Sequence, residues 1–261
     1  FGPTGHTGRP RSPGAAKYTT KDAAMSYATE ERVAVLGAAG AIGSNLAQSL
    51  LQLDVTGDVR MYDPYEAGLP PSNVTTLAAL DSTRLQTALA QRFGVRQDKV
   101  TGCRTYGGHG EKMAIFKGTI KIDGKPLTDY LREGFLSPED WQEIQEHTQG
   151  GGARIIKLRG RSSFQSPAHL SARMVKAVAE GSDFEWPCGA YITDGDYAGV
   201  MMAADTSLGK TGVRYRIPDG DAEDLAALKD SHAHLVSLRD QTIADGILPP
   251  LNEWKRHNSN L

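Results

Sequence analysis

A short apolar run that ends in regularly spaced glycines constrains this chain more than any other stretch. Residues 33–36 (VAVL) have the composition of a buried parallel strand. Gly37, Gly40 and Gly43 follow at intervals of three, and a helical apolar pattern begins at Ala47. Because glycine has no Cβ, a pyrophosphate can approach the N–H groups at the start of such a helix. The order strand, glycine turn, helix therefore predicts a dinucleotide-binding fold.

An acidic residue at the expected distance supports this interpretation. Asp63 follows the last of these glycines by 20 residues and closes a second short strand, residues 59–62. An acid at about this spacing holds the ribose hydroxyls of the adenosine, and its charge repels a 2′-phosphate, which favours NAD over NADP. A glycine turn that packs closely and binds nothing is the alternative, since the spacing is G-x-x-G-x-x-G. The candidate cofactor-binding residues are Gly37, Gly40, Ala41, Ile42, Gly43 and Asp63.

Composition removes several classes of function. The net charge of −2 gives no reason to expect a nucleic-acid partner. No apolar run approaches the roughly 20 residues that cross a bilayer, so no membrane contact is expected. Cys103 and Cys188 lack metal-ligand spacing, and His232 and His234 lie on different faces of a predicted helix. We therefore expect no metal, reduced thiols and a soluble protein of the cytoplasm.

The chain divides into three predicted parts. Residues 1–24 are rich in Gly, Pro, Ser and Thr, which indicates a leader or a disordered tail, with a targeting peptide for an organelle matrix as the alternative. Residues 25–102 are predicted to form the dinucleotide-binding domain, and residues 103–261 the catalytic and substrate-binding domain. The expected fold class is α/β, a Rossmann-type domain followed by an α+β domain.

The predicted nucleotide domain is too short. Only ten residues, 64–73, connect the second strand to the next one, expected at 74–80. Two further strands and two helices would take roughly 35 residues or more. A block is therefore missing near residues 69–70, either from the protein itself or from this sequence.

After residue 73 the hydrophobic periodicity predicts further helices and strands. The capping box Ser137–Asp140 opens a helix that reaches Gly150. The other predicted helices are 82–93, 166–179 and 222–244, with 153–158 ambiguous between helix and strand. The predicted strands are 74–80, 100–106, 119–122, 125–127, 185–193, 200–205 and 213–217. The last three are expected to form an antiparallel meander, and Asp123-Gly124 a hairpin turn.

Three separate residues suit the oxidation of a 2-hydroxy acid. Asp81 is expected at a strand end, Arg84 lies one helical turn beyond it, and His109 lies in a glycine-flanked loop. Imidazole can take the hydroxyl proton, a carboxylate beside it fixes its tautomer, and a guanidinium can hold the substrate carboxylate through two hydrogen bonds. Taken singly, each has a plainer interpretation: a helix N-cap, an exposed helix cation and a turn residue.

Several motifs together resemble the malate dehydrogenase branch of the lactate/malate dehydrogenase family. They are GAAGAIG at 37–43, YDP at 62–64, LDSTRL at 80–85, YGGHGE at 106–111, GGGARIIKLRGRSSFQSP at 150–167 and MMAADTS at 201–207. The resemblance covers nearly all of residues 29–261. It implies that Asp81 and His109 form a proton relay, that Arg84 binds the substrate carboxylate and that Ser163 lines the substrate pocket.

The resemblance also implies an activity. It implies NAD-dependent interconversion of malate and oxaloacetate by a homo-oligomer, a dimer or a tetramer. The family pattern carries two more substrate-facing arginines on a mobile loop, whereas residues 64–80 contain no arginine. A shortened chain is therefore expected to bind NAD poorly and to turn over little malate. The alternatives are an inactive relative that serves as a binding or subunit-interaction module, and a dehydrogenase of another 2-hydroxy acid.

Overall fold

The computed structural model describes residues 33–36, 50, 59–62, 70–181, 184–246 and 248–257. Residues 33–36, 59–62 and 257 are described by their backbone alone. The predicted leader, residues 1–24, lies outside the described residues, as do all six candidate cofactor-binding residues: Gly37, Gly40, Ala41, Ile42, Gly43 and Asp63.

The described part of the chain contains both helices and strands, so the α/β class is confirmed. The α-helices are α2 (Ala79–Phe93), α3 (Leu127–Arg132), α4 (Pro138–Gln149), α5 (Gly151–Arg159), α6 (Gln165–Glu180), α7 (Ala222–Ala244) and α8 (Trp254–His257). The strands are β1 (Val33–Leu36), β2 (Val59–Tyr62), β3 (Val100–Thr101), β4 (Arg104–Gly107), β5 (Met113–Phe116), β6 (Lys121–Ile122), β7 (Lys125–Pro126), β8 (Cys188–Tyr191), β9 (Met201–Gly209) and β10 (Gly212–Arg216). Short 3-10 turns are η1 (Pro71–Asn73), η2 (Gln97–Lys99), η3 (Gly110–Lys112), η4 (Gly195–Tyr197) and η5 (Leu251–Glu253).

The two predicted N-terminal strands are confirmed, and they pair in parallel. Val33 lies opposite Val59 and Leu36 opposite Tyr62, so the carboxyl ends of β1 and β2 meet at one edge. Gly37 follows β1 directly and Asp63 follows β2 directly in the sequence. The end of β1, after which the candidate glycines follow in the sequence, and the end of β2, after which Asp63 follows, therefore lie at the same edge of this strand pair.

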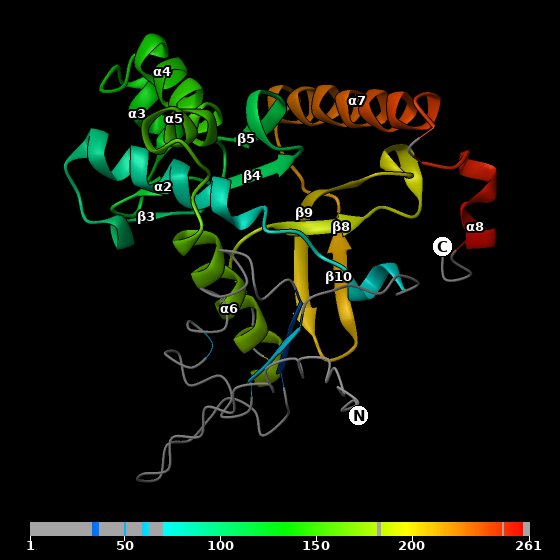
Figure 1. The fold of residues 1–261 in the computed structure, drawn as a ribbon. Helices are drawn as coiled ribbons and strands as arrows, with labels where there is room; N and C mark the ends of the chain where they lie inside the picture. Colours follow the sequence, from blue (N-terminus) through cyan, green and yellow to red (C-terminus); the bar gives the residue numbers. More distant parts are fainter. Residues whose placement is uncertain are drawn as a thin grey trace, which may run out of the picture.

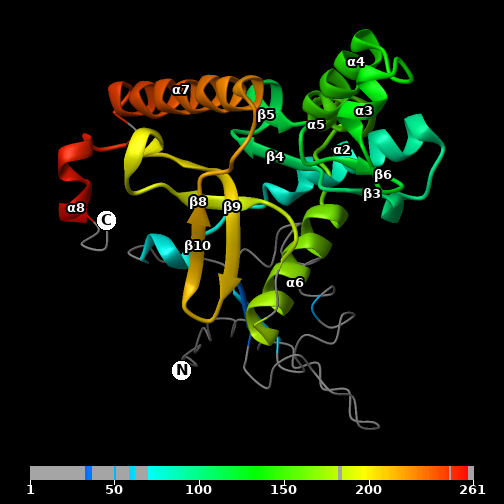
Figure 2. The ribbon, with the colours of Figure 1, turned by 180° about the vertical axis from the view of Figure 1, so that it is seen from behind.

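An antiparallel sheet, whose strands differ in length, forms the centre of the remaining described chain. Its strand order is β10-β9-β4-β5, and β8 pairs with the first half of β9. The predicted meander of β8, β9 and β10 is thus confirmed, with β9 as its middle strand. Helix α7 lies across β4 and β5, while α2, α3, α4 and α5 group at the other side (Figure 1). Figure 2 shows from behind that α6 descends beside β9.

The strand predicted at 74–80 is wrong. Residues 74–78 have no regular structure, and α2 begins at Ala79, three residues before the predicted start. The segment is held beside β8 by isolated bonds: Thr75 Oγ1 donates to the carbonyl of Gly189 at 2.8 Å, and Gly189 N–H donates to the carbonyl of Thr76 at 3.1 Å. These few bonds do not extend into a ladder, so the β-branched run gives no strand.

The predicted strand 100–106 is broken into β3 and β4 at Gly102. This glycine has φ +69°, and a Cβ there would lie 2.8 Å from the carbonyl carbon of Thr119. The two halves then join different sheets, because β3 pairs with β6 whereas β4 pairs with β5 and β9. A close backbone approach, invisible in the sequence, ends the strand.

Local signals predicted several other boundaries well. The capping box is present: Asp140 N–H donates to Ser137 Oγ at 3.0 Å, and Asp140 accepts from Ser137 N–H. Asp123 and Gly124, both at positive φ, turn the β6–β7 hairpin. Helix α7 spans the predicted range, and the ambiguous stretch 153–158 is helical within α5. Such signals act over a few residues, so tertiary context rarely overrides them.

Two apolar clusters hold these elements together. The first lies between α2, α4, α6 and the small β3-β6-β7 sheet, and the second lies under α7. Cys103 and Cys188 are buried and unpaired, and burial raises the pKa of the Cys103 thiol to about 12 and that of Cys188 to about 11. Both thiols are therefore protonated side chains of the core. None of the helices in the described residues has the length and apolar character of a membrane span.

Candidate active site

The first two turns of α2 carry two of the three predicted residues, Asp81 and Arg84, and the first turn is fixed to β4. Ser82, fully buried, accepts a hydrogen bond from Thr105 N–H at 3.0 Å, and its Oγ lies 3.0 Å from Thr105 Oγ1. Asp81 lies in this turn, where the N-terminal end of the helix favours a negative charge. Asp81 is only 4% exposed. The prediction that Asp81 ends a strand is wrong, but its carboxylate is held at a defined place.

The loop that carries His109 is held by α7. A Cβ on Gly107, which has φ +76°, would lie 2.7 Å from Cβ of Ser231. The next residue, Gly108, donates its N–H to Ser231 Oγ at 2.8 Å. Ser231 is fully buried. The two glycines therefore allow α7 to approach the end of β4, and Ser231 fixes the backbone immediately before His109.

These two supports bring the carboxylate and the imidazole together. His109 Nδ1 lies 2.6 Å from Asp81 Oδ2. Because an ionised carboxylate only accepts hydrogen bonds, Nδ1 is the donor, and this leaves Nε2 free to exchange a proton. The hydrogen bond to Asp81 raises the pKa of His109, because it stabilises the imidazolium. The imidazole is 67% exposed, so a substrate can reach it.

Arg84 completes a three-residue cluster. Its Nη1 donates to Asp81 Oδ1 at 2.8 Å, so the two oxygens of one carboxylate hold Arg84 and His109 separately. Helix α5 begins beside this cluster: a Cβ built on Gly152 would lie 3.7 Å from both Arg84 Nη1 and His109 Nε2. The missing side chain at Gly152 leaves open space next to both groups. The structure therefore brings together the three residues that sequence reasoning grouped.

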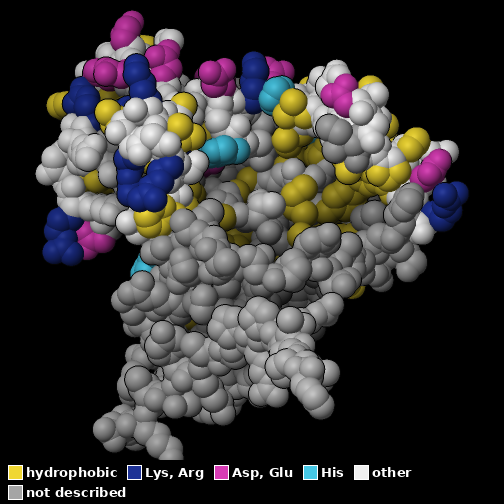
Figure 3. All heavy atoms as spheres, viewed as in Figure 1, with side chains coloured by type: hydrophobic (Ala, Val, Ile, Leu, Met, Phe, Trp, Pro, Cys, Tyr) yellow, Lys and Arg dark blue, Asp and Glu magenta, His cyan; other side chains and the backbone are white. Residues whose placement is uncertain are grey.

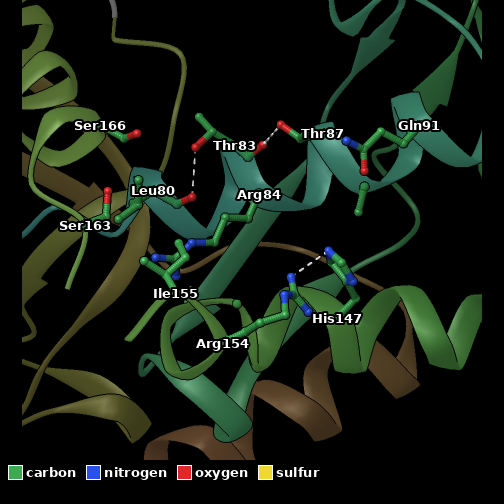
Figure 4. Close-up of a pocket in the computed structure, with 12 residues that line it drawn as sticks. Leu80, Thr83, Arg84, Thr87, Gln91, His147, Arg154, Ile155, Ser163 and Ser166 are labelled. Carbon is green, nitrogen blue, oxygen red and sulfur yellow. Dashed lines mark hydrogen bonds between the residues drawn. The ribbon is translucent and has the colours of Figure 1, made fainter. Parts of the chain in front are cut away.

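A groove of about 290 Å³ runs between α2 and α5 (Figure 4). Arg84 lies at one end of it, and the predicted Ser163 shares this end. Its lining is Leu80, Thr83, Arg84, Thr87, Ala88, Gln91, His147, Gly151, Arg154, Ile155, Ser163 and Ser166. Ser163 thus lies in the same groove as Arg84, on the segment between α5 and α6.

Sequence reasoning missed two groups at the other end of this groove. Arg154 Nη2 lies 2.7 Å from His147 Nε2, and both side chains point between the two helices (Figure 4). Burial, and then the charge of Arg154, lower the pKa of His147, so this imidazole is neutral near pH 7. In the surface view, basic side chains gather over α5 (Figure 3). The stretch GGGAR at 150–154 was read for its resemblance alone, and its arginine was not singled out.

Sequence reasoning also missed Ser82 and Ser231, which position Asp81 and His109. Serine is common in both helices and loops, and neither residue belongs to a spacing pattern. No metal-binding cluster of His, Cys, Asp or Glu occurs among the residues that the structure describes. The site is therefore built from one carboxylate, two arginines, the imidazoles of His109 and His147, and hydroxyl groups.

Comparison with known proteins places the chain in a family. The crystal structure of malate dehydrogenase from Plasmodium falciparum in complex with NADH shares the fold, with a TM-score of 0.72 at 17% identity over 82% of this chain and 99% of that chain. The similarity defines a protein of the predicted α/β class, with a Rossmann-type domain and a second domain. The sequence model of the lactate/malate dehydrogenase α/β C-terminal domain matches residues 78–242. The chain belongs to the lactate/malate dehydrogenase family.

Two relatives give the extent of the similarity. A malate dehydrogenase from Pelagibacter ubique is 34% identical over 151 residues, which are 56% of this chain and 47% of that protein. A malate dehydrogenase from Salinibacter ruber is 31% identical over 188 residues, which are 70% of this chain and 58% of that protein. The chain thus spans about half the length of the curated relatives it matches.

Proposed function

We propose that this protein is an NAD-dependent malate dehydrogenase, which interconverts malate and oxaloacetate. The observation that carries the proposal is the cluster of Asp81, Arg84 and His109, in which one buried carboxylate orients both an arginine and an exposed imidazole. The space beside Gly152 adjoins His109 Nε2 and Arg84 Nη1. A 2-hydroxy acid in that space could place its hydroxyl against the imidazole and its carboxylate against the guanidinium.

Each residue has a role in the proposed reaction. During malate oxidation His109 Nε2 accepts the hydroxyl proton while a hydride leaves C2, and during oxaloacetate reduction the imidazolium returns that proton. Asp81 stabilises the imidazolium and keeps Nδ1 as the donor. Arg84 binds the carboxylate next to C2 through charge-assisted hydrogen bonds. Ser163 lines the groove from the α6 side.

The residues proposed to hold the cofactor follow β1 and β2. The parallel register pairs Leu36 with Tyr62, so β1 and β2 end at one edge, and a dinucleotide binds at the carboxyl ends of such strands. We propose that Gly37, Gly40, Ala41, Ile42 and Gly43 surround the pyrophosphate and that Asp63 binds the adenosine ribose. NAD would supply the hydride acceptor. Three further points stay predictions. They are a domain boundary between residues 102 and 103, an oligomer of two or four chains, and a missing block near residues 69–70.

The short stretch of ten residues, 64–73, that the sequence leaves after Asp63 for the rest of the nucleotide domain favours a second candidate, a binding or interaction module without turnover. An intact-mass measurement on the natural protein separates the two readings of that stretch. About 28 kDa, the mass of this sequence, would mean that the short stretch is real. A larger mass would mean that a block is missing from the sequence.

The proposed function is tested by following NADH absorbance with oxaloacetate and, separately, with pyruvate. We expect oxidation of NADH with oxaloacetate and much slower oxidation with pyruvate. The substitution His109→Asn should abolish turnover while NADH binding stays nearly unchanged, because the proton acceptor is removed and the cofactor site is not. Undiminished turnover in His109→Asn would reject the proton relay, and a preference for pyruvate would point to another 2-hydroxy acid.

A further inference from the structure

Three consecutive glycines lie where α4 ends and α5 begins. Gly150 is the residue between the two helices, and Gly151 and Gly152 are the first two residues of α5. Glycine destabilises a helix relative to alanine, because its backbone loses more conformational freedom on folding. A glycine at the start of a helix is therefore expected to have a steric or a functional reason.

Two of the three glycines have a steric reason. A Cβ built on Gly150 would lie 3.1 Å from the backbone carbonyl oxygen of Glu146. A Cβ on Gly151 would lie 3.2 Å from Cδ of Arg84. Both distances are shorter than the roughly 3.5–4.0 Å at which non-bonded heavy atoms pack best. A side chain at either position would therefore displace a neighbour.

Gly152 has no steric reason of this kind among the described residues. It does not have a positive φ, so its backbone conformation accepts alanine. A Cβ on Gly152 would lie 3.7 Å from Arg84 Nη1, 3.7 Å from His109 Nε2 and 3.9 Å from Arg84 Nη2, which are ordinary contact distances. The fold would thus tolerate alanine at this position, and α5 would gain stability from it.

The atoms that a side chain at position 152 would meet are those that carry the proposed reaction. His109 Nε2 is the proposed proton acceptor, and the guanidinium of Arg84 is the proposed partner of the substrate carboxylate. A 2-hydroxy acid bound to both groups has its C2 between them, since C2 carries both the hydroxyl and the carboxylate. The substituent on C2 then needs room in the volume next to Gly152, which a Cβ would fill.

We propose that Gly152 is a specificity-determining residue, which reserves room for the substituent that the substrate carries on C2. This inference rests on the proposed function, because that function places the hydroxyl and the carboxylate. A side chain at position 152 narrows the site to the smallest 2-hydroxy acids. Glycolate, which carries only hydrogen as its substituent, still fits, whereas malate, which carries a carboxymethyl group, is excluded.

Malate and glycolate are the probes for this assignment, and Gly152→Ala is the substitution. We would titrate the full chain with each acid, with and without NADH, and follow the imidazole signal of His109 by NMR. Neither acid can be oxidised by the reduced cofactor, so binding is measured without turnover. Both acids should shift the signal in the wild-type protein. In Gly152→Ala the dissociation constant for malate should rise at least about tenfold, as is typical when a pocket is too small by one carbon, and that for glycolate should stay nearly unchanged.

Two further measurements separate a loss of room from damage to the fold. Gly152→Ala should melt at the temperature of the wild type or up to about 3 °C higher, because alanine favours the helix. Without either acid, its His109 should titrate with pH as in the wild type, because the bond to Asp81 is untouched. The matched control is Ala153→Leu, which enlarges the next residue of α5 at an exposed position outside the groove lining. This control should bind both acids as the wild type does.

Three results would overturn the role of Gly152. They are a wild-type protein that binds neither acid, a Gly152→Ala protein that binds malate as tightly as the wild type, and one in which both acids are weakened equally. The NADH assay with oxaloacetate distinguishes these results from a failure of the proposed function. The expected binding without any turnover would reject the dehydrogenase and keep the role of Gly152. Unchanged kinetics for oxaloacetate in Gly152→Ala would reject the role of Gly152 and keep the dehydrogenase.

Discussion

Arg84 and Arg154 face the same groove, but the structure holds them in different ways. The side chain of Arg84 is 18% exposed and is paired with a carboxylate that is itself buried. Arg154 is exposed, and its single partner in the described chain is the neutral imidazole of His147. The wall formed by α2 is thus fixed by buried polar contacts, whereas the wall formed by α5 is held at the surface.

The difference has a physical consequence for each wall. Removing one partner of a buried, charged hydrogen bond leaves the other partner desolvated and unpaired, so its neighbours are disturbed as well. An exposed arginine that loses its partner is solvated by water instead. We therefore expect changes at the α2 wall to affect chemistry and stability together, and changes at Arg154 on the α5 wall to have little effect on the free energy of unfolding.

Among the changes that test this difference between the two walls, Asp81→Asn should have the largest effect, and the effect is on turnover. An amide cannot stabilise the imidazolium of His109, and it also removes the ion pair of Arg84. Turnover of oxaloacetate with NADH should fall by about 10²-fold or more, and the imidazole of His109, followed by NMR, should titrate at lower pH. The control is Asp205→Asn, because Asp205 bonds Tyr106 and Arg216 away from the relay. Equal loss of turnover in both variants would contradict a special role for Asp81.

The substitution Gly107→Ala should have the next largest effect, on the free energy of unfolding. The new Cβ meets Ser231 on α7 and also sits at φ +76°, so a loss of about 3 kcal/mol is expected. Gly94→Ala is the matched control, because Gly94 has φ +63° with no atom within 4 Å of its Cβ, and should lose about 1 kcal/mol. Chemical denaturation measures both. Similar losses would mean that α7 does not fix the loop before His109.

The smallest expected effect is that of the His109–Asp81 pair on how the free energy of unfolding changes with pH. The hydrogen bond to Asp81 raises the pKa of His109 in the folded protein above its ordinary value near 6.5. The pair therefore stabilises the fold fully below about pH 6.5, and this contribution is lost as pH rises through the folded pKa. The difference in unfolding free energy between wild type and His109→Asn should be largest near pH 6 and shrink toward alkaline pH. A difference that grows with pH would contradict the assigned hydrogen bond.

Local chemistry made much of the fold predictable. The capping box at Ser137, the Asp123-Gly124 turn and the glycines that end α2 and α6 each act over a few residues, so the sequence alone places them. The strand expected at 74–80 failed for the opposite reason. Whether a β-branched segment joins a sheet depends on a partner strand, and here the neighbour is β8, 114 residues away from Thr75 in its contact with Gly189.

The residues of the candidate site also fall into two groups, those that compact motifs predicted and those that the sequence did not reveal. The residues Asp81, Arg84 and His109 were grouped by chemistry and by a family resemblance, because their motifs are compact. Arg154, Ser82 and Ser231 could not be found, since each acts through a contact between elements: the bond from Gly108 to Ser231 spans 123 residues. No periodicity or spacing rule connects residues so far apart.

The class of the fold, the ends of α4, α6 and α7, and the groups able to move a proton and bind a carboxylate could all be predicted from the amino-acid sequence. The tertiary structure alone decided that one buried carboxylate holds both His109 and Arg84, and that a second arginine faces the same groove. The physical reason is the separation along the chain over which each kind of interaction acts. Caps, turns and amphipathic faces depend on neighbours in the chain, whereas a shared carboxylate and a shared groove exist only after distant elements have packed.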